Sequence, residues 1–203
     1  MRHANVVAVL CLGVAAGACR RDKPGETAAA PAIDTAVAAI TGDSVRDTTR
    51  VPGDTSVATA AAEIASAQGQ PLGSAQLRDS VGGVVVHAQI TGLKPGNHGF
   101  HVHTVGRCDP PAFESAGPHW NPTNKQHGRQ NPAGWHAGDL ANLGAAAEGV
   151  AQVDQTIEGA TIRDLLEGDG SALVVHADPD DNKTDPSGNS GARIACGVIH
   201  RVP

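Results

Sequence analysis

The sequence is poor in aromatic and basic residues. Among its 203 residues Tyr is absent, Phe and Trp occur twice each, and the formal net charge is -6. Proteins that bind nucleic acid neutralise phosphates with basic surfaces and stack bases on aromatic rings. This composition therefore argues against nucleic acid as a partner.

Histidine, in contrast, is frequent, and ten His accompany a single Met. Imidazole is a versatile metal ligand and is costly to bury without a partner. The bias therefore indicates metal binding before any motif is considered. The length fits one domain with extensions and a single hydrophobic core of ordinary size.

The N-terminus resembles a secretory signal. After a basic start, residues 4–18 are mostly apolar and uncharged, a stretch too short to remain in a membrane as a span. Small residues precede Cys19, as in bacterial lipoprotein signals, although Ala16 stands where such signals usually carry Leu. We predict a signal peptide over 1–18 and a lipid on Cys19. The alternative is ordinary cleavage near Ala18 that leaves a free thiol.

The remaining cysteines bear on the compartment. Once the signal has taken Cys11 away and Cys19 is acylated, Cys108 and Cys196 remain. An even pair of thiols in an exported protein is typical of a disulfide, because oxidising compartments let thiols pair and stay paired. We therefore expect an exported protein, either periplasmic or anchored to a membrane only through the lipid on Cys19.

The rest of the chain divides into two parts. Residues 20 to 56 are mostly Ala, Thr, Pro, Asp and Gly with no sustained period, so they cannot bury enough surface to order themselves. We predict a flexible tether over 19–56 and one folded domain over 57–203. In that domain, apolar residues alternate over residues 84–90, which predicts a half-buried strand with His87 facing outward.

Two long loops separate the strand-like segments. They run from His103 to about Ala137 and from Ala177 to Arg193, and both are rich in Pro, Gly, Asn and Asp. Loops of this length in a compact domain are usually functional or disordered, and the His residues in and beside them favour function. We expect an all-β fold, a Greek-key β-barrel or sandwich of about eight antiparallel strands, with helix confined to the region around 161–166.

The histidines fall into metal-ligand spacing. His101 and His103 leave the same face of a predicted strand and can reach one ion, although such a pair alone is equally compatible with a solvated strand face. His176 ends a later strand. The loop between supplies three imidazoles and, shortly after, one carboxylate, a set that suits tetrahedral zinc: His119, His127, His136 and Asp139.

Four separated motifs now specify a family. They are GNHGFHVH at 96–103, SAGPHWNP at 115–122, HAGDL at 136–140 and GNSGARIACGVI at 188–199. In this order they resemble the copper/zinc superoxide dismutase family, over the chain from about residue 57 to its end. Each motif alone is weak, but their agreement in order is specific.

The resemblance implies the cofactors and their ligands. Copper would be bound by His101, His103, His119 and His176, and zinc by His119, His127, His136 and Asp139. His119 would then be an imidazolate shared by two cations. Asp180 would hydrogen-bond the outer nitrogens of His101 and His127, although Asp178 and Asp181 lie beside it. Cys108 and Cys196 match the intrachain disulfide of the family.

The resemblance also implies the reaction. A superoxide dismutase converts superoxide to oxygen and hydrogen peroxide by redox cycling of copper, while zinc is structural. His119 would carry a proton in that cycle, and Arg193 would attract and bind the superoxide anion in a protein of net negative charge. The alternative is a non-enzymatic copper- or zinc-binding module of the same fold, which should lack a copper ligand or the arginine. A homodimer is compatible with the resemblance.

Overall fold

The computed structural model describes residues 60–202. The predicted signal peptide, Cys19 and the tether lie outside these residues. Within 60–202, no helix has the length and apolar character needed to cross a bilayer.

Strands dominate the described residues. The ten strands within 60–202 are β1 (Ala60–Ser66), β2 (Pro71–Ser80), β3 (Gly83–Ile90), β4 (Gly96–His98), β5 (Phe100–His103), β6 (Leu143–Ala145), β7 (Ala151–Glu158), β8 (Ala172–His176), β9 (Arg193–Val198) and β10 (His200–Arg201). One short helix, α1 (Ile162–Leu166), and a 3-10 turn, η1 (Glu114–Ala116), complete the described elements. The helix lies where it was expected, and the Thr161 side chain caps it together with the Asp164 carboxylate.

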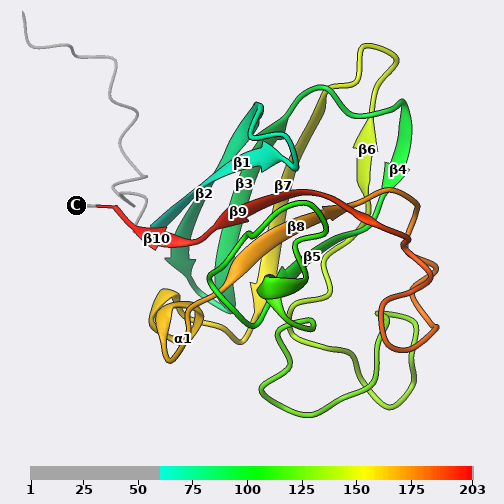
Figure 1. Cartoon of the computed structure of the whole chain (residues 1–203). Helices are drawn as coiled ribbons and strands as arrows, with labels where there is room; N and C mark the ends of the chain where they lie inside the picture. Colours follow the sequence, from blue (N-terminus) through cyan, green and yellow to red (C-terminus); the bar gives the residue numbers. More distant parts are fainter. Residues whose placement is uncertain (1–59, 203) are drawn as a thin grey trace, which may run out of the picture. The chain divides into compact units, whose positions relative to one another are not determined.

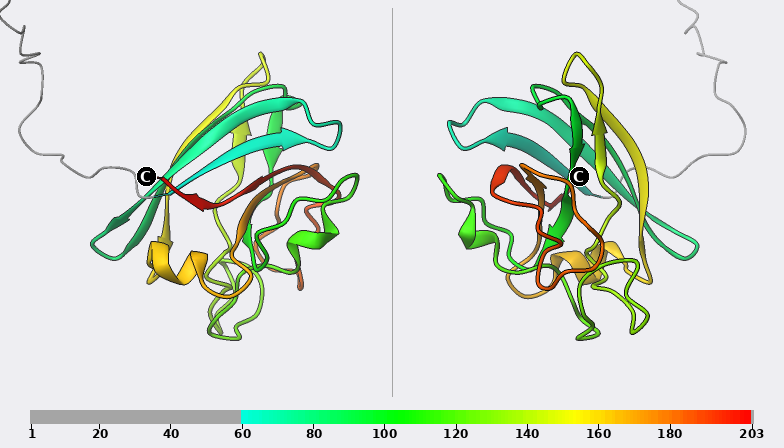
Figure 2. Two further views of the ribbon diagram at one scale, coloured as in Figure 1. Left: turned by 60° about the vertical axis from the view of Figure 1, so that its left-hand side comes forward. Right: turned by 90° about the vertical axis from the view of Figure 1, so that its right-hand side faces the viewer.

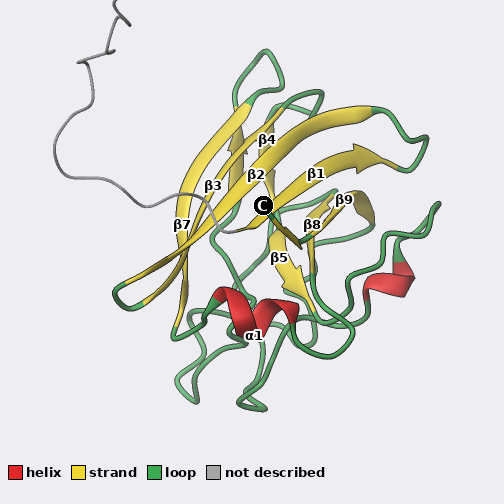
Figure 3. Cartoon of the chain, turned by 90° about the vertical axis from the view of Figure 1, so that its left-hand side faces the viewer, coloured by secondary structure: helices red, strands yellow, loops and turns green. Residues whose placement is uncertain are grey.

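Eight of the strands form one antiparallel sheet. Figures 1 and 3 show that this sheet is curled. Its order is β5-β8-β9-β1-β2-β3-β7, with β10 also paired to β1, while β4 and β6 form a separate two-stranded ribbon. Strand β1 hydrogen-bonds β2 on one side and β9 on the other, so the two ends of the domain meet in the sheet. The all-β barrel or sandwich is confirmed.

Alternation along the strands places the core inside the curl. On β3, Val84, Val86, Ala88 and Ile90 are buried while His87 is exposed, as the sequence pattern predicted. Strand β8 differs, because all five of its residues are buried. Its Leu173 and Val175 join the main core. Ala172 and Val174 instead pack into a smaller hydrophobic cluster with Phe113, Ala116 and Cys196. The outer face of β8 is therefore covered by a loop.

The two long loops lie next to each other at one side of the sheet (Figure 2). The first long loop, residues 104–142, joins β5 to β6, and the second long loop, residues 177–192, joins β8 to β9. Hydrogen bonds tie them together, from the Gln130 amide to the Asn182 carbonyl and from the His127 amide to the Asp185 carboxylate. The loops therefore support each other rather than relying on the core alone.

A disulfide fixes the first long loop to the sheet. Cys108 in the loop is bonded to Cys196 on β9, with 5.7 Å between their Cα atoms. The pairing expected from the sequence is confirmed. It closes a loop over a sequence separation of 88 residues.

Removing this crosslink should lower stability measurably. In the chain-entropy model a loop of this length contributes at most about 4–5 kcal/mol, because the bridge restricts the unfolded chain. We expect the metal-free double variant Cys108→Ser/Cys196→Ser to lose about 2–4 kcal/mol of unfolding free energy in urea titrations. Chemical reduction of the unmodified chain is the matched control and should give the same loss. An unchanged urea midpoint in both would contradict the stabilising role.

Candidate metal centre

Four histidines converge from three parts of the fold. His101 and His103 lie on β5, His119 lies in the first long loop, and His176 ends β8. One nitrogen from each ring lies within 4.8 Å of the corresponding nitrogen of the other three, and all four residues are buried.

Backbone pairing explains why the loop reaches β5. The Trp120 amide donates to the Val102 carbonyl, the Val102 amide donates to the Gly138 carbonyl, and the Gly138 amide donates back to the Trp120 carbonyl. A side chain at Gly138 would collide with the Val102 carbonyl, so this close approach requires glycine. The ligand-bearing segments at His119 and Asp139 are thereby bridged to β5.

The outer nitrogens of the four rings have acceptors. His101 Nε2 lies 2.8 Å from an Asp180 oxygen and His103 Nδ1 lies 2.7 Å from the Gly117 carbonyl. His119 Nδ1 lies 2.8 Å from an Asp139 oxygen, and His176 Nδ1 lies 3.2 Å from the Gly191 carbonyl. Without a metal, these acceptors hold the ring protons on the outer side, and a metal bound at His119 Nδ1 would replace the proton there.

The inner nitrogens consequently carry lone pairs that face one another. His101 Nδ1 and the Nε2 atoms of His103, His119 and His176 are buried, and none has a hydrogen-bond partner within residues 60–202. Four converging lone pairs without a partner are unfavourable in a buried site unless a cation lies between them. The donor set fits a transition metal that accepts imidazole.

Burial keeps these rings neutral. It lowers the pKa of His101, lowers the pKa of His103 well below its usual value, and lowers the pKa of His119 to about 4 and of His176 to about 3. Neutral imidazole is the form that binds metal. The first cluster is therefore in its ligating state across the physiological pH range.

A second cluster surrounds the Asp139 carboxylate. Its Oδ1 atom lies 2.8 Å from His119 Nδ1, 3.1 Å from His127 Nδ1 and 3.2 Å from His136 Nδ1. Tetrahedral zinc with bonds of about 2.0–2.1 Å has ligand-to-ligand edges of about 3.3 Å. The three distances from Asp139 are therefore close to the edges of a tetrahedral site, and one carboxylate with three imidazoles is a zinc-type donor set.

Proton affinities in this second cluster indicate a place for positive charge. Burial opposes charging of His127, but hydrogen bonds to Asp139 and Asp180 outweigh it and raise the His127 pKa to about 9. Burial likewise opposes ionisation of Asp139, yet its hydrogen bonds to the three imidazoles hold its pKa far below the usual range. A buried carboxylate oxygen that three imidazole nitrogens approach in this way is suited to a divalent metal.

Asp180 connects the two clusters through the ring nitrogens that point away from them. Its Oδ2 accepts from His101 Nε2 at 2.8 Å, and its Oδ1 accepts from His127 Nε2 at 3.0 Å. The neighbouring Asp181 instead binds the second long loop through Thr184 and Asn189. A Cβ at Gly188 would overlap the Asp180 carboxylate, so glycine is needed there to admit it.

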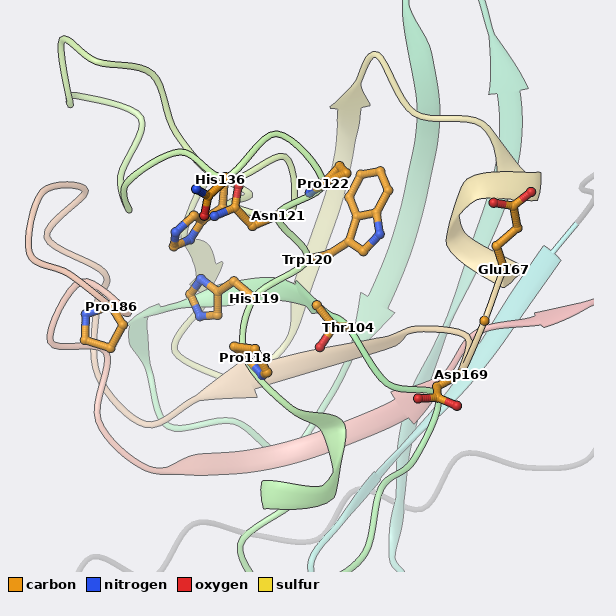
Figure 4. A pocket seen from close by; sticks show the side chains of 12 residues that line it. Thr104, Pro118, His119, Trp120, Asn121, Pro122, His136, Glu167, Asp169 and Pro186 are labelled. Atoms are coloured by element: carbon orange, nitrogen blue, oxygen red, sulfur yellow. The ribbon is translucent and has the colours of Figure 1, made fainter.

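His119 belongs to both clusters. Its Nε2 points to the first cluster and its Nδ1 to the second. His119 and His136 line a pocket of about 580 Å³. Figure 4 shows these two side chains, with Glu167 and Asp169 at the other side of the pocket. Solvent therefore approaches the shared ring and the second cluster from this pocket.

Arg193 lies at the start of β9, close to the first cluster. Its Nη1 donates to the Phe113 carbonyl at 2.6 Å and its Nη2 to the Gly117 carbonyl at 2.8 Å. Burial is the main cause that lowers the pKa of His103 and His176, and the positive charge of the nearby Arg193 adds to this lowering. Arg193 also lines a pocket of about 460 Å³ together with Glu114. This pocket offers an anion a cationic wall.

The other histidines stand apart from the metal clusters. His98 is buried, with Nδ1 2.8 Å from the His176 carbonyl and Nε2 2.8 Å from the Lys94 carbonyl, so its contacts are structural. His87 and His200 are exposed.

The Arg129 guanidinium lies 5.0 Å from the Trp135 ring centroid, and the Arg129 side chain also donates to the Asp139 carbonyl.

Sequence reasoning missed several groups that support the site. Phe113 and Gly117 contribute only backbone carbonyls, and Asn142 exchanges hydrogen bonds with the Asp180 backbone. Gly117 lies in the motif at 115–122, but neither its carbonyl nor that of Phe113 can be assigned a role from sequence, because any residue type provides a carbonyl. Asn142 lies three residues after Asp139, and its amide is the one side-chain signal among them.

Known proteins resemble this chain in sequence. The family model described as copper/zinc superoxide dismutase (SODC) matches residues 72–199. A superoxide dismutase [Cu-Zn] 1 of Aquifex aeolicus is 41% identical over 144 residues, covering 68% of this chain and 85% of the relative. A superoxide dismutase [Cu-Zn] of Caulobacter vibrioides is 42% identical over 147 residues, covering 69% of this chain and 84% of the relative.

A solved structure agrees with the sequence relatives. The crystal structure of a SOD-like protein from Bacillus subtilis has a TM-score of 0.66 and 39% sequence identity, covering 68% of this chain and 96% of that one. The chain therefore belongs to the copper/zinc superoxide dismutase family, as an enzyme that acts on superoxide with copper and zinc as its cofactors.

Proposed function

We propose that this enzyme dismutates superoxide at copper held by the first cluster, with zinc held by the second. The observation that carries the assignment is the set of four buried imidazole nitrogens without partners beside a carboxylate ringed by three imidazoles. The copper ligands are His101, His103, His119 and His176, and the zinc ligands are His119, His127, His136 and Asp139.

The donor chemistry supports placing the metals in this order. Zinc has no redox activity and favours a closed tetrahedral site of imidazole and carboxylate, which describes the second cluster. An all-imidazole site suits copper, which cycles between two oxidation states and would supply the electron exchange with superoxide. Asp180 would orient His101 and His127 and so couple the geometry of the two sites.

Residues of the chain would bind the substrate and move the proton. The Arg193 guanidinium is positioned to attract the superoxide anion and to donate hydrogen bonds to it beside the first cluster. His119 is the ring that can present a proton from Nε2 toward that cluster while Nδ1 stays engaged with the second. Two superoxide anions and two protons give one oxygen and one hydrogen peroxide, and His119 would deliver one of those protons.

The alternative, a non-enzymatic copper- or zinc-binding module of the same fold, is not favoured. Such a module should lack a copper ligand or the arginine, and here all four proposed copper ligands are present and converge. Arg193 is also present and hydrogen-bonded. Both features support catalysis over simple metal storage.

We further propose that the enzyme is exported and tethered. Residues 1–18 would be the signal peptide, Cys19 the lipidated residue, 19–56 the tether and 57–203 the catalytic domain, placing the enzyme in the periplasm or on a membrane. The Cys108–Cys196 disulfide supports export, since such bonds persist in oxidising compartments. A homodimer is a further prediction that sedimentation of the mature protein would test.

Substituting one ligand from each cluster should separate the two metal roles. We expect His176→Gln to lose copper and to reduce dismutation to below about 1% of wild type, because copper is the redox centre. His136→Gln should retain copper but bind zinc more weakly. Loss of a residue that only hydrogen-bonds a metal ligand typically lowers metal affinity about 10–100-fold, and loss of the ligand His136 itself should lower it further. Metal content per chain and superoxide decay measure both. Activity that survives in a copper-free His176→Gln protein would refute the copper assignment.

The carboxylate of Glu114 should slow anion capture. Glu114 shares the pocket with Arg193, and its charge opposes the lowering of the Arg193 pKa by burial. We expect Glu114→Gln to raise the second-order rate constant about twofold at low ionic strength, an advantage that salt screening removes. Glu148→Gln, in the exposed turn between β6 and β7, is the matched control and should leave the rate unchanged. An equal effect of both changes would mean that only net charge matters.

The lipid prediction depends on one thiol. We expect the mature wild-type protein to begin at Cys19, to carry acyl chains by mass spectrometry and to fractionate with membranes. Cys19→Ser should remain exported and active but appear in the soluble fraction. A wild-type N-terminus with an unmodified Cys19 would instead establish ordinary signal cleavage.

A further inference from the structure

The guanidinium of Arg193 is held by the two residues that flank η1. Phe113 precedes this turn and Gly117 follows it, and both carbonyls accept hydrogen bonds from Arg193. The Gly117 carbonyl also accepts from His103 Nδ1 at 2.7 Å. One short turn therefore sets the position of the arginine relative to a proposed copper ligand.

The backbone of Phe113 is in an unusual conformation. Its φ is 54° and its ψ is 26°, in the left-handed region that bulky residues rarely adopt. In this conformation its carbonyl accepts both the Arg193 bond at 2.6 Å and the bond from the Ala116 amide, at 3.1 Å, that closes the turn. Backbone strain of this kind persists only where surrounding contacts hold it in place.

The ring of Phe113 provides those contacts. Phe113 is 3% exposed although it lies between the exposed residues Ala112 and Glu114. It packs in the smaller hydrophobic cluster, against Ala172 and Val174 of β8 and against the disulfide-bonded Cys196. Burial of the ring on the sheet therefore fixes the backbone that points at the arginine.

We propose that Phe113 is a positioning residue for superoxide capture: its buried ring holds a left-handed backbone whose carbonyl orients the Arg193 guanidinium toward the copper site. This inference rests on the proposed role of Arg193. The apolar anchor, and not the aromatic ring as such, is what the role requires. Phe113 makes no contact with substrate in this scheme and acts through Arg193.

A double-mutant cycle tests the inference in the full chain loaded with copper and zinc. The variants are Phe113→Ala, Phe113→Leu, Arg193→Ala and the Phe113→Ala/Arg193→Ala pair. Leu77→Ala, in the fully buried main core on β2, is the control for general destabilisation. Metal content is measured for each protein, and superoxide decay is followed at low and high ionic strength.

We expect Arg193→Ala to lower the second-order rate constant about tenfold, since it removes a charged donor and the local attraction. Phe113→Ala should lower it about threefold to fivefold and weaken its dependence on ionic strength, while Phe113→Leu stays within about twofold of wild type. When Arg193 is already Ala, adding Phe113→Ala should lower the rate constant by a further factor of less than about two. Leu77→Ala should reduce stability without changing the rate constant.

A second readout does not need activity. In the metal-free protein, the guanidinium hydrogens of Arg193 should give protected NMR signals in wild type and Phe113→Leu, and lose protection in Phe113→Ala but not in Leu77→Ala. Retained protection in Phe113→Ala, or the same fold-loss of rate in both Arg193 backgrounds, would overturn the inference. If the loaded wild type does not dismutate superoxide, the proposed function fails, and the NMR comparison still decides whether Phe113 positions Arg193.

Discussion

The convergence of four imidazole lone pairs in a buried space is the constraint on which the rest of this structure depends. Each inner nitrogen faces the others because its ring proton is held outside by an acceptor. Burial removes the water that would otherwise solvate those nitrogens and lowers the proton affinity of the rings. The hydration free energy that these nitrogens lose on burial is recovered when a cation binds them. Packing of the site and metal binding are therefore coupled.

The scaffold follows from the need to hold the outer nitrogens. Their acceptors come from distant segments: Gly117 in the first long loop, Gly191 in the second, and the carboxylates of Asp139 and Asp180. Neither loop has a regular ladder of its own. The first long loop is instead fastened by backbone bridges to β5 and by the disulfide, and the two loops are fastened to each other by hydrogen bonds. The sheet is the rigid part of the domain. The loops carry the metal ligands, and they hold these ligands in place only because many bonds fasten them to the sheet and to each other.

Side-chain patterns predicted much of this arrangement, and backbone contributions could not be predicted. Alternation on β3 fixed the buried face because a strand has a period of two, and the HxH pair at 101 and 103 placed two rings on one face for the same reason. The pairing of Cys108 and Cys196 was likewise readable from residue type. The carbonyls of Phe113 and Gly117 were not, because every residue carries that group and only the path of the loop decides where it points.

The same carbonyls resolve how an acidic protein can attract an anion. The chain carries a net charge of -6, so its overall field repels superoxide. Arg193 is nevertheless held by neutral carbonyl oxygens and not by a carboxylate, so its hydrogen bonds fix its orientation without cancelling its charge. Two donors are used in this way, and the guanidinium has five, which leaves donors for an anion. Had an acidic side chain held the arginine instead, the same geometry would have been reached with the attraction neutralised. The choice of backbone acceptors therefore keeps a local positive charge beside the metal site in a protein whose net charge is negative.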